Sequence, residues 1–131
     1  MGDPAGIGPE ICIKALSDAT VYERCRPVVI GDAAVMAQAA TLLNAPLKVN
    51  AIEKIADATF AFGTVDVYDL KNVTLSELKP GEVSAMAGNA AFEAVHKVIE
   101  LALANEVDAT VTAPINKESI HKAGHHFSGH T

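Results

Sequence analysis

The chain has 131 residues, half of them hydrophobic and a fifth charged, and its formal net charge is −6. This composition is typical of a folded globular protein, and its acidic balance excludes a basic surface for nucleic acid or for an anionic membrane. No uncharged run of about 18 apolar residues occurs, which excludes a membrane span, and a chain with only two cysteines fits the reducing cytoplasm better than a secreted disulfide scaffold.

The first ten residues form a loop rich in glycine and proline that leads into a helix. Pro9 suits the first helical turn, where its missing N–H costs no hydrogen bond. In an α/β protein such a loop follows a buried strand, so the backbone near Gly6 and Gly8 is a candidate to face an anion or a cofactor phosphate. Asp3 is a candidate acceptor or helix cap. The spacing matches neither the G-x-G-x-x-G fingerprint nor a P-loop, so a tight turn that brings helix and strand together is the alternative.

Strands and helices alternate through the rest of the chain. Apolar runs and alternating patterns predict strands, and alanine- and leucine-rich stretches predict helices. This alternation predicts the α/β class with a mostly parallel sheet. The predicted elements are a strand at 26–32, a helix at 33–43 capped by Asp32, a strand at 47–52, a half-exposed strand at 64–69, a helix at 84–104, a buried strand at 107–112 and a helix at 116–121 that ends at Gly124.

The helix predicted at 84–104 is the clearest element. Its larger apolar residues fall at helical spacing on one side, which predicts that this side is buried. Glu93 and Lys97 lie on the other side as a favourable i,i+4 pair, and His96 is expected to be a partly exposed structural residue. The residues of the predicted buried side are Phe92, Val95, Ile99, Ala102 and Leu103.

The stretch after 107–112 carries most of the side chains suited to chemistry. Asn116 and Lys117 begin a possible substrate or cofactor loop, in which Lys117 meets a phosphate or carboxylate as a point charge; a solvated lysine at a helix start is equally compatible with the sequence. His130 follows a glycine and precedes Thr131, so the two are a candidate substrate clamp.

Three further histidines lie close to this clamp. His121 and His125 have the i,i+4 spacing of metal ligands, but Gly124 interrupts the helix between them. Lys122 stands where the H-E-x-x-H motif has its glutamate. We therefore expect no metal site here, and we expect surface-loop positions for His121, His125 and His126.

Both ends of the sequence have the character of an interrupted domain. A glycine loop that opens a helix is expected to follow a strand, and the polar stretch at 127–131 contains no closing element. The sequence therefore predicts a fragment, or a truncated reading frame.

Four segments together resemble the 4-hydroxythreonine-4-phosphate dehydrogenase (PdxA-type) family. They are 1–10 (MGDPAGIGPE), 84–88 (SAMAG), 112–117 (TAPINK) with 123–124 (AG), and 129–131 (GHT). Their order and spacing agree over the whole chain. The Ala-Pro-Ile-Asn-Lys variant is most similar to the branch of 4-phospho-threonate or 4-phospho-erythronate dehydrogenases.

The resemblance implies a nicotinamide-dependent oxidation, with NAD or NADP, of a phosphorylated four-carbon hydroxy acid, followed by loss of CO2. It also implies a place in pyridoxine biosynthesis and a divalent metal such as Zn, Mg or Co, bound by three histidines. The implied fold is a three-layer α/β/α one, similar to isocitrate and isopropylmalate dehydrogenases, in a two-domain cytoplasmic homodimer. His130 and Thr131 match the substrate-binding pair, and Asp3 and Lys117 match signature positions without an assigned role.

The chain departs from the family pattern in what it lacks. Residues 1–131 correspond to a partial N-terminal domain, without the first strand, the second domain or the metal ligands. The fragment alone is therefore expected to be inactive. The alternative from a different class is a non-catalytic α/β remnant or interaction module that binds at most an anion at its first loop.

Overall fold

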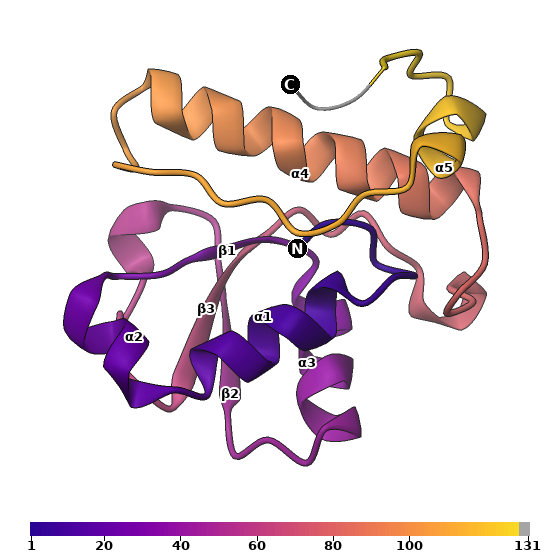
Figure 1. Ribbon diagram of the computed structural model, residues 1–131. Helices are drawn as coiled ribbons and strands as arrows, with labels where there is room; N and C mark the ends of the chain where they lie inside the picture. The colour runs from indigo at the N-terminus through magenta and orange to yellow at the C-terminus, as the bar shows by residue number, and fades with distance from the viewer. Residues whose placement is uncertain (129–131) are drawn as a thin grey trace.

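The computed structural model describes residues 1–128 and, within them, a three-stranded parallel sheet between helices (Figure 1). The strands are β1 (Val29–Gly31), β2 (Lys48–Ile52) and β3 (Thr64–Asp69), in the order β1-β3-β2. Val29 pairs with Val67, and Lys48 pairs with Thr64. The predicted α/β class with a parallel sheet is therefore confirmed.

Side-chain caps define where most of the helices begin. Asp18, Asp32, Ser84 and Asn116 each accept a hydrogen bond from an amide in the first turn of the helix that follows. Such caps satisfy amides that have no partner within the helix. The helices are α1 (Gly8–Leu16), α2 (Ala19–Arg24), α3 (Ala33–Leu42), α4 (Ala85–Leu103) and α5 (Lys117–Lys122), with 3-10 turns at Ile55–Asp57 and Leu75–Glu77.

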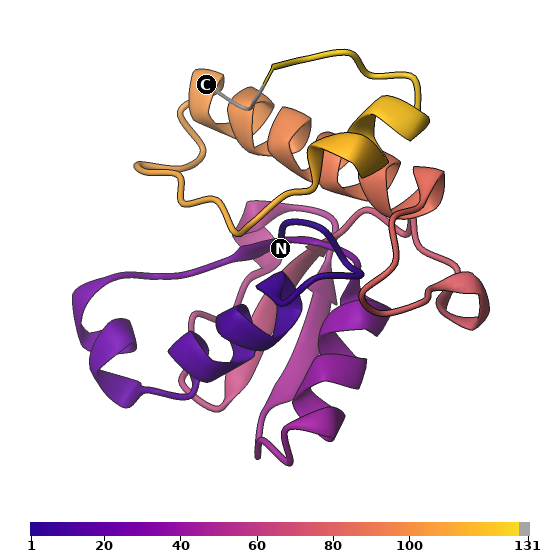
Figure 2. The same ribbon diagram turned by 45° about the vertical axis from the view of Figure 1, so that its right-hand side comes forward.

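The sheet has a hydrophobic core on each face. On one face Val65 and Val67 pack with Ile13 of α1 and Met36 of α3, all fully buried. On the other face Ile30 packs with residues of α4, and Figures 1 and 2 show that helix crossing the sheet on the side away from α1 and α3. Helices thus cover both faces, which confirms the three-layer α/β/α arrangement.

The strand at 64–69 is more buried than its alternating sequence predicts. It is the central strand, and Asp66 is only 1% exposed. The Asp66 carboxylate accepts hydrogen bonds from Asn50 Nδ2 at 2.8 Å, Thr59 N at 3.0 Å and Phe60 N at 2.9 Å. The prediction of a half-exposed strand was wrong because these donors let a carboxylate occupy a buried position.

The predicted strand at 107–112 is not a strand in the structure. The segment is extended but lies outside the sheet, and Val111 is 92% exposed. The edge of β1 is instead contacted by the start of the chain, because Met1 N donates to Ile30 O at 3.0 Å. Asp3 N in turn donates to Pro114 O at 3.0 Å. The first residues therefore separate this segment from β1 (Figure 1).

The buried side of α4 carries mostly alanine and glycine. It is not the side with the larger apolar residues, which the sequence predicts to be buried. Ile99 is 51% exposed and Leu103 is 80% exposed. Small residues face inward because α5 packs very closely on this helix. The Glu93–Lys97 pair is also absent among residues 1–128, where Lys97 pairs with Glu100 at 2.6 Å. The buried residues of α4 are Ala87, Gly88, Ala90, Ala91, Ala94 and Leu101.

Within residues 1–128, no helix is both long enough and apolar enough to span a lipid bilayer.

Candidate functional site

The carboxyl ends of β1 and β3 lie at the edge of the sheet where ligands bind in parallel α/β folds. Asp32, directly after β1, accepts from Val35 N at 3.0 Å and from Val73 N at 3.1 Å. Asp69, at the end of β3, accepts from Ala33 N at 3.0 Å. These two carboxylates therefore fasten the loops after the strands to the start of α3, and the predicted cap at Asp32 is confirmed.

The structure brings the loop at 1–10 close to residues 113–114, which come just before the predicted pair Asn116 and Lys117. Gly2 has a left-handed φ of +78°, and a Cβ on it would lie 2.5 Å from Pro114 O. A Cβ on Gly8 would collide with Met1 O and approach Ala113. Larger residues would hold the two segments apart, so these glycines serve a close approach between segments that are distant in the sequence.

Asp3 is held inside the first loop. Its side chain is 5% exposed and accepts a hydrogen bond from Ala5 N at 2.8 Å. Gly6 N donates to the Asp3 carbonyl oxygen at 3.0 Å. The amides of Ala5 and Gly6, near the candidate anion site, thus donate to Asp3 within the loop. The Asp3 carboxylate also lies next to them. Gly6 itself remains exposed.

The second predicted pair lies at the start of α5. Asn116 Oδ1 accepts from Ser119 N at 2.9 Å, so this side chain is a helix cap. Lys117 is exposed and, among residues 1–128, forms no ion pair. An exposed ammonium in that position can meet an anion as a point charge.

The histidines of the described region are dispersed around α4 and α5. His125 contacts Asn89 of α4, His121 contacts Phe127 O at 3.0 Å, and His96 lies 3.7 Å from Glu100. Within residues 1–128, no three His, Cys, Asp or Glu side chains come together to hold a metal ion. His125 is half-buried, whereas the sequence predicts a surface-loop position for it. His130 and Thr131 lie outside the described residues.

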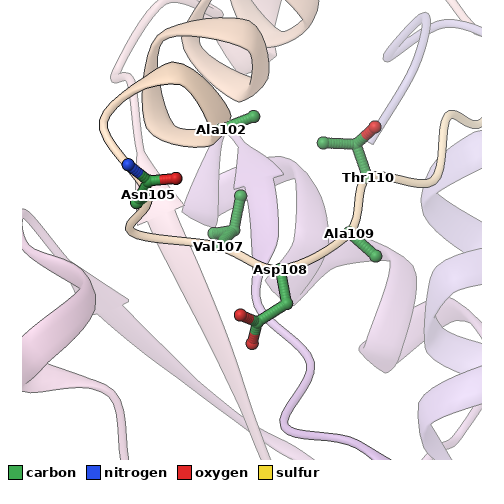
Figure 3. A pocket seen from close by; sticks show the side chains of 6 residues that line it. All are labelled: Ala102, Asn105, Val107, Asp108, Ala109 and Thr110. Atoms are coloured by element: carbon green, nitrogen blue, oxygen red, sulfur yellow. The ribbon is translucent and has the colours of Figure 1, made fainter.

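An open hollow of about 390 Å³ lies at the C-terminal end of α4 (Figure 3). Its walls come from the last turn of that helix and the extended segment after it. Asp108 is the ionisable side chain in this wall, and none of the site residues predicted from the sequence takes part. The lining residues are Ala102, Asn105, Val107, Asp108, Ala109 and Thr110.

Sequence reasoning missed the polar contacts around Glu93. This carboxylate accepts from Asn89 Nδ2 at 2.8 Å and from Asn72 Nδ2 at 2.8 Å. Asn89 and Glu93 have i,i+4 spacing on a helix, a signal that marks a side-chain pair. The contribution of Asn72 comes from a distant loop and leaves no local signal.

Comparison with known proteins gives one consistent result. The sequence profile of the family described as "Pyridoxal phosphate biosynthetic protein PdxA" matches residues 23–131. Over all 131 residues the chain is 48% identical to a relative from Clostridium botulinum, of whose length it spans 39%. It is 44% identical to the D-threonate 4-phosphate dehydrogenase of Cupriavidus necator and again spans 39% of that protein.

A solved structure agrees closely with this chain. The 4-hydroxythreonine-4-phosphate dehydrogenase from Burkholderia phymatum superposes on 98% of it with a TM-score of 0.96 and 41% sequence identity. The match covers 39% of that longer chain.

Proposed function

The chain belongs to the PdxA family, and from this membership we propose that it is part of a nicotinamide-dependent dehydrogenase acting on a phosphorylated four-carbon hydroxy acid. The observation that carries the proposal is the identity of 44% to a D-threonate 4-phosphate dehydrogenase over the whole chain. D-threonate 4-phosphate and 4-hydroxythreonine 4-phosphate are the two substrates that the names of its relatives provide. Residues 1–131 would form a partial N-terminal domain of that enzyme.

The proposed reaction is an oxidation at a secondary alcohol. The carbinol carbon gives a hydride to NAD or NADP, and the hydroxyl gives up its proton. The resulting ketone lies next to the carbon that bears the carboxylate, so the bond to that carboxylate can break with release of CO2. The electron pair of that bond forms an enolate, which then takes up a proton at the same carbon. A place in pyridoxal phosphate biosynthesis follows for the 4-hydroxythreonine substrate.

The proposed substrate contacts come from residues that the sequence singles out. His130 and Thr131 would donate hydrogen bonds to carboxylate or hydroxyl oxygens of the substrate. Lys117, exposed at the start of α5, would meet the phosphate or the carboxylate. Asp3, Gly6, Gly8 and Asn116 would shape the loops around these groups.

A divalent metal does not fit the described residues. No group of three suitable side chains occurs within 1–128, so we place the metal ligands elsewhere in the complete protein and assign this region no step that involves the ion. We also propose a cytoplasmic homodimer whose partner is a small phosphorylated substrate, not nucleic acid or membrane. The acidic net charge of −6 supports this choice of partner.

The test uses the longest reading frame that contains these residues. The purified protein is supplied with NAD or NADP and a divalent metal, and formation of reduced nucleotide is followed with D-threonate 4-phosphate, 4-hydroxythreonine 4-phosphate and 4-phosphoerythronate. We expect turnover of at least one substrate, with loss of activity on chelation. A folded, metal-loaded protein that reduces neither nucleotide with any of them would refute the proposal. The 131-residue chain alone is the matched control and should be inactive.

A further inference from the structure

The starts of α4 and α5 are joined through one buried serine. Ser119 lies in the first turn of α5 and is 0% exposed. Its Oγ accepts a hydrogen bond at 3.3 Å from the backbone N of Ser84, the residue that caps α4. Its own backbone N donates at 2.9 Å to Asn116 Oδ1, the side chain that caps α5. Ser119 is therefore hydrogen-bonded to the capping residues of both helices.

A close approach of the two backbones accompanies these hydrogen bonds. Both views show α5 beside the first turns of α4 (Figures 1 and 2). A Cβ on Gly88 of α4 would collide with the backbone carbonyl of Ser119, so the two helices are in direct contact there. In a close-packed contact of this kind, one element cannot shift without moving the other. The first turn of α5 is therefore fixed relative to α4 by packing as well as by hydrogen bonds.

The segments that lead into these two helices both bond to the first loop of the chain. Asp3 N donates at 3.0 Å to the carbonyl oxygen of Pro114, just before α5. Gly81 N, in the turn before α4, donates at 2.7 Å to the carbonyl oxygen of Ala5. Lys117 is the first residue of α5 and is exposed. The backbone that carries this lysine is thus held to the first loop on one side and to α4 on the other.

We propose that Ser119 is a positioning residue that acts through Lys117. Both residues belong to the first turn of α5, so the contacts that fix this turn also fix the point from which the lysine side chain extends. A lysine loses rotamer freedom when it binds an anion, and a backbone that is ordered beforehand avoids a further loss. This inference rests on the proposed function, in which Lys117 meets the phosphate or the carboxylate of the substrate.

Four substitutions separate positioning from a general loss of stability. Ser119→Ala removes the acceptor of Ser84 N and adds no bulk to the contact. Ser119→Cys keeps a side chain of similar shape and supplies a sulfur, which is a weak acceptor. Lys117→Ala removes the ammonium itself. Leu101→Ala is the matched control for lost stability, because Leu101 is buried near the opposite end of α4.

Isothermal titration calorimetry of the complete, metal-loaded protein measures the Kd for D-threonate 4-phosphate and for 4-hydroxythreonine 4-phosphate. Lys117→Ala should raise the Kd at least about tenfold, the factor provided by one hydrogen bond to a charged group. Ser119→Ala should raise it about fivefold, the ordering cost of one mobile side chain, and Ser119→Cys should raise it less. In the Lys117→Ala background, Ser119→Ala should change the Kd by less than about twofold, because the serine acts through the lysine. Leu101→Ala should keep the wild-type Kd, since partial unfolding lowers the number of binding sites and not their affinity.

A wild-type Kd in Ser119→Ala, or the same increase with and without Lys117, would overturn the proposal. An increase in Leu101→Ala as large as that in Ser119→Ala would overturn it too. Binding without turnover would count against the proposed dehydrogenase activity, and the comparison of Kd values would still decide on Ser119. Turnover by the wild type together with an unchanged Kd in Lys117→Ala would refute this inference alone. A wild-type protein that binds neither acid would refute both.

Discussion

Replacing Asp66 with asparagine tests the buried carboxylate of the central strand. One carboxylate oxygen accepts from Asn50 Nδ2 and Thr59 N, and the other accepts from Phe60 N at 2.9 Å. Asparagine has the same shape but puts an NH2 group where one oxygen was. Whichever way the amide turns, its NH2 group faces at least one N–H donor, which is left without an acceptor.

The expected loss of stability follows from that count. A buried donor without a partner costs about 1–3 kcal/mol, and hydrogen bonds to a charged acceptor are each worth about 1.5–3 kcal/mol. We therefore expect Asp66→Asn to lower the free energy of unfolding by about 2–4 kcal/mol at neutral pH. Such a loss is large compared with the stability of about 5–15 kcal/mol of ordinary domains.

The pH dependence provides a second signature of the same carboxylate. Burial raises the pKa of Asp66, but the hydrogen bonds from Asn50, Thr59 and Phe60 outweigh it, so the pKa lies below its ordinary value. For a carboxyl whose pKa is depressed in the folded state, the stabilisation is complete above the unfolded pKa of about 3.9. It is lost as the pH falls through the folded pKa. The stability difference between wild type and Asp66→Asn should therefore be constant near neutrality and shrink below about pH 4.

Urea unfolding of the 131-residue chain, followed by circular dichroism between pH 3 and pH 7, measures both quantities. Asp57→Asn is the control, since Asp57 is exposed, and it should change the free energy of unfolding by less than about 0.5 kcal/mol. If Asp66→Asn were as stable as wild type at pH 7, or if the difference grew on acidification, the reasoning would be wrong.

Four further predictions concern packing and the proposed site. Gly88→Ala should lower the unfolding free energy by about 1–3 kcal/mol, because its Cβ collides with the α5 backbone; denaturant unfolding measures this. Asp32→Ala removes the acceptor of two backbone amides and should cost about 2 kcal/mol in the same assay. Leu101→Ala should cost about 2–5 kcal/mol and Leu103→Ala less than about 0.5 kcal/mol, because only Leu101 is buried; equal losses would contradict the assigned face of α4. In the complete enzyme, His130→Ala should mainly raise the substrate KM, and unchanged kinetics would remove His130 from the site.

Local chemistry made the element boundaries predictable. Asp32 precedes an alanine-rich stretch, and Asn44 with Pro46 follows it, so both limits of α3 are visible in the sequence. The same holds at α5, where Asn116 caps the start and Gly124, with φ of +92°, follows the end. These signals act over three or four residues and do not depend on the rest of the fold.

The burial of side chains depended on neighbours that the sequence does not reveal. On α4 the larger apolar residues predicted the wrong buried side, because Gly88 and its alanine neighbours allow α5 and the sheet to come close. On β3 the alternation predicted exposure for Asp66, whose donors come from a neighbouring strand and a loop. Both errors arise from contacts that only the folded chain creates.

The rule that the carboxyl ends of parallel strands meet at one edge applies to Asp32 and Asp69, at the ends of β1 and β3. It does not account for the position of residues 113–114, because 107–112 is not a strand in the structure. Asp3 and Asn116 have their side-chain oxygens bonded to amides of their own loop or helix. His125 has the sequence context of a surface loop, and its contact with Asn89 follows only from the return of the chain along α4.

These contacts divide the matched family segments into two kinds of residue. Gly2 and Gly8 allow the first loop to approach Ala113 and Pro114, and caps such as Asn116 hold the ends of the elements. The glycines are needed for this close approach, and the side-chain oxygen of Asn116 is already hydrogen-bonded within its helix. Lys117 differs, because it is exposed and has no ion-pair partner within residues 1–128. Among the proposed site residues in the described region, it therefore has the charge and the freedom that binding a phosphorylated acid requires.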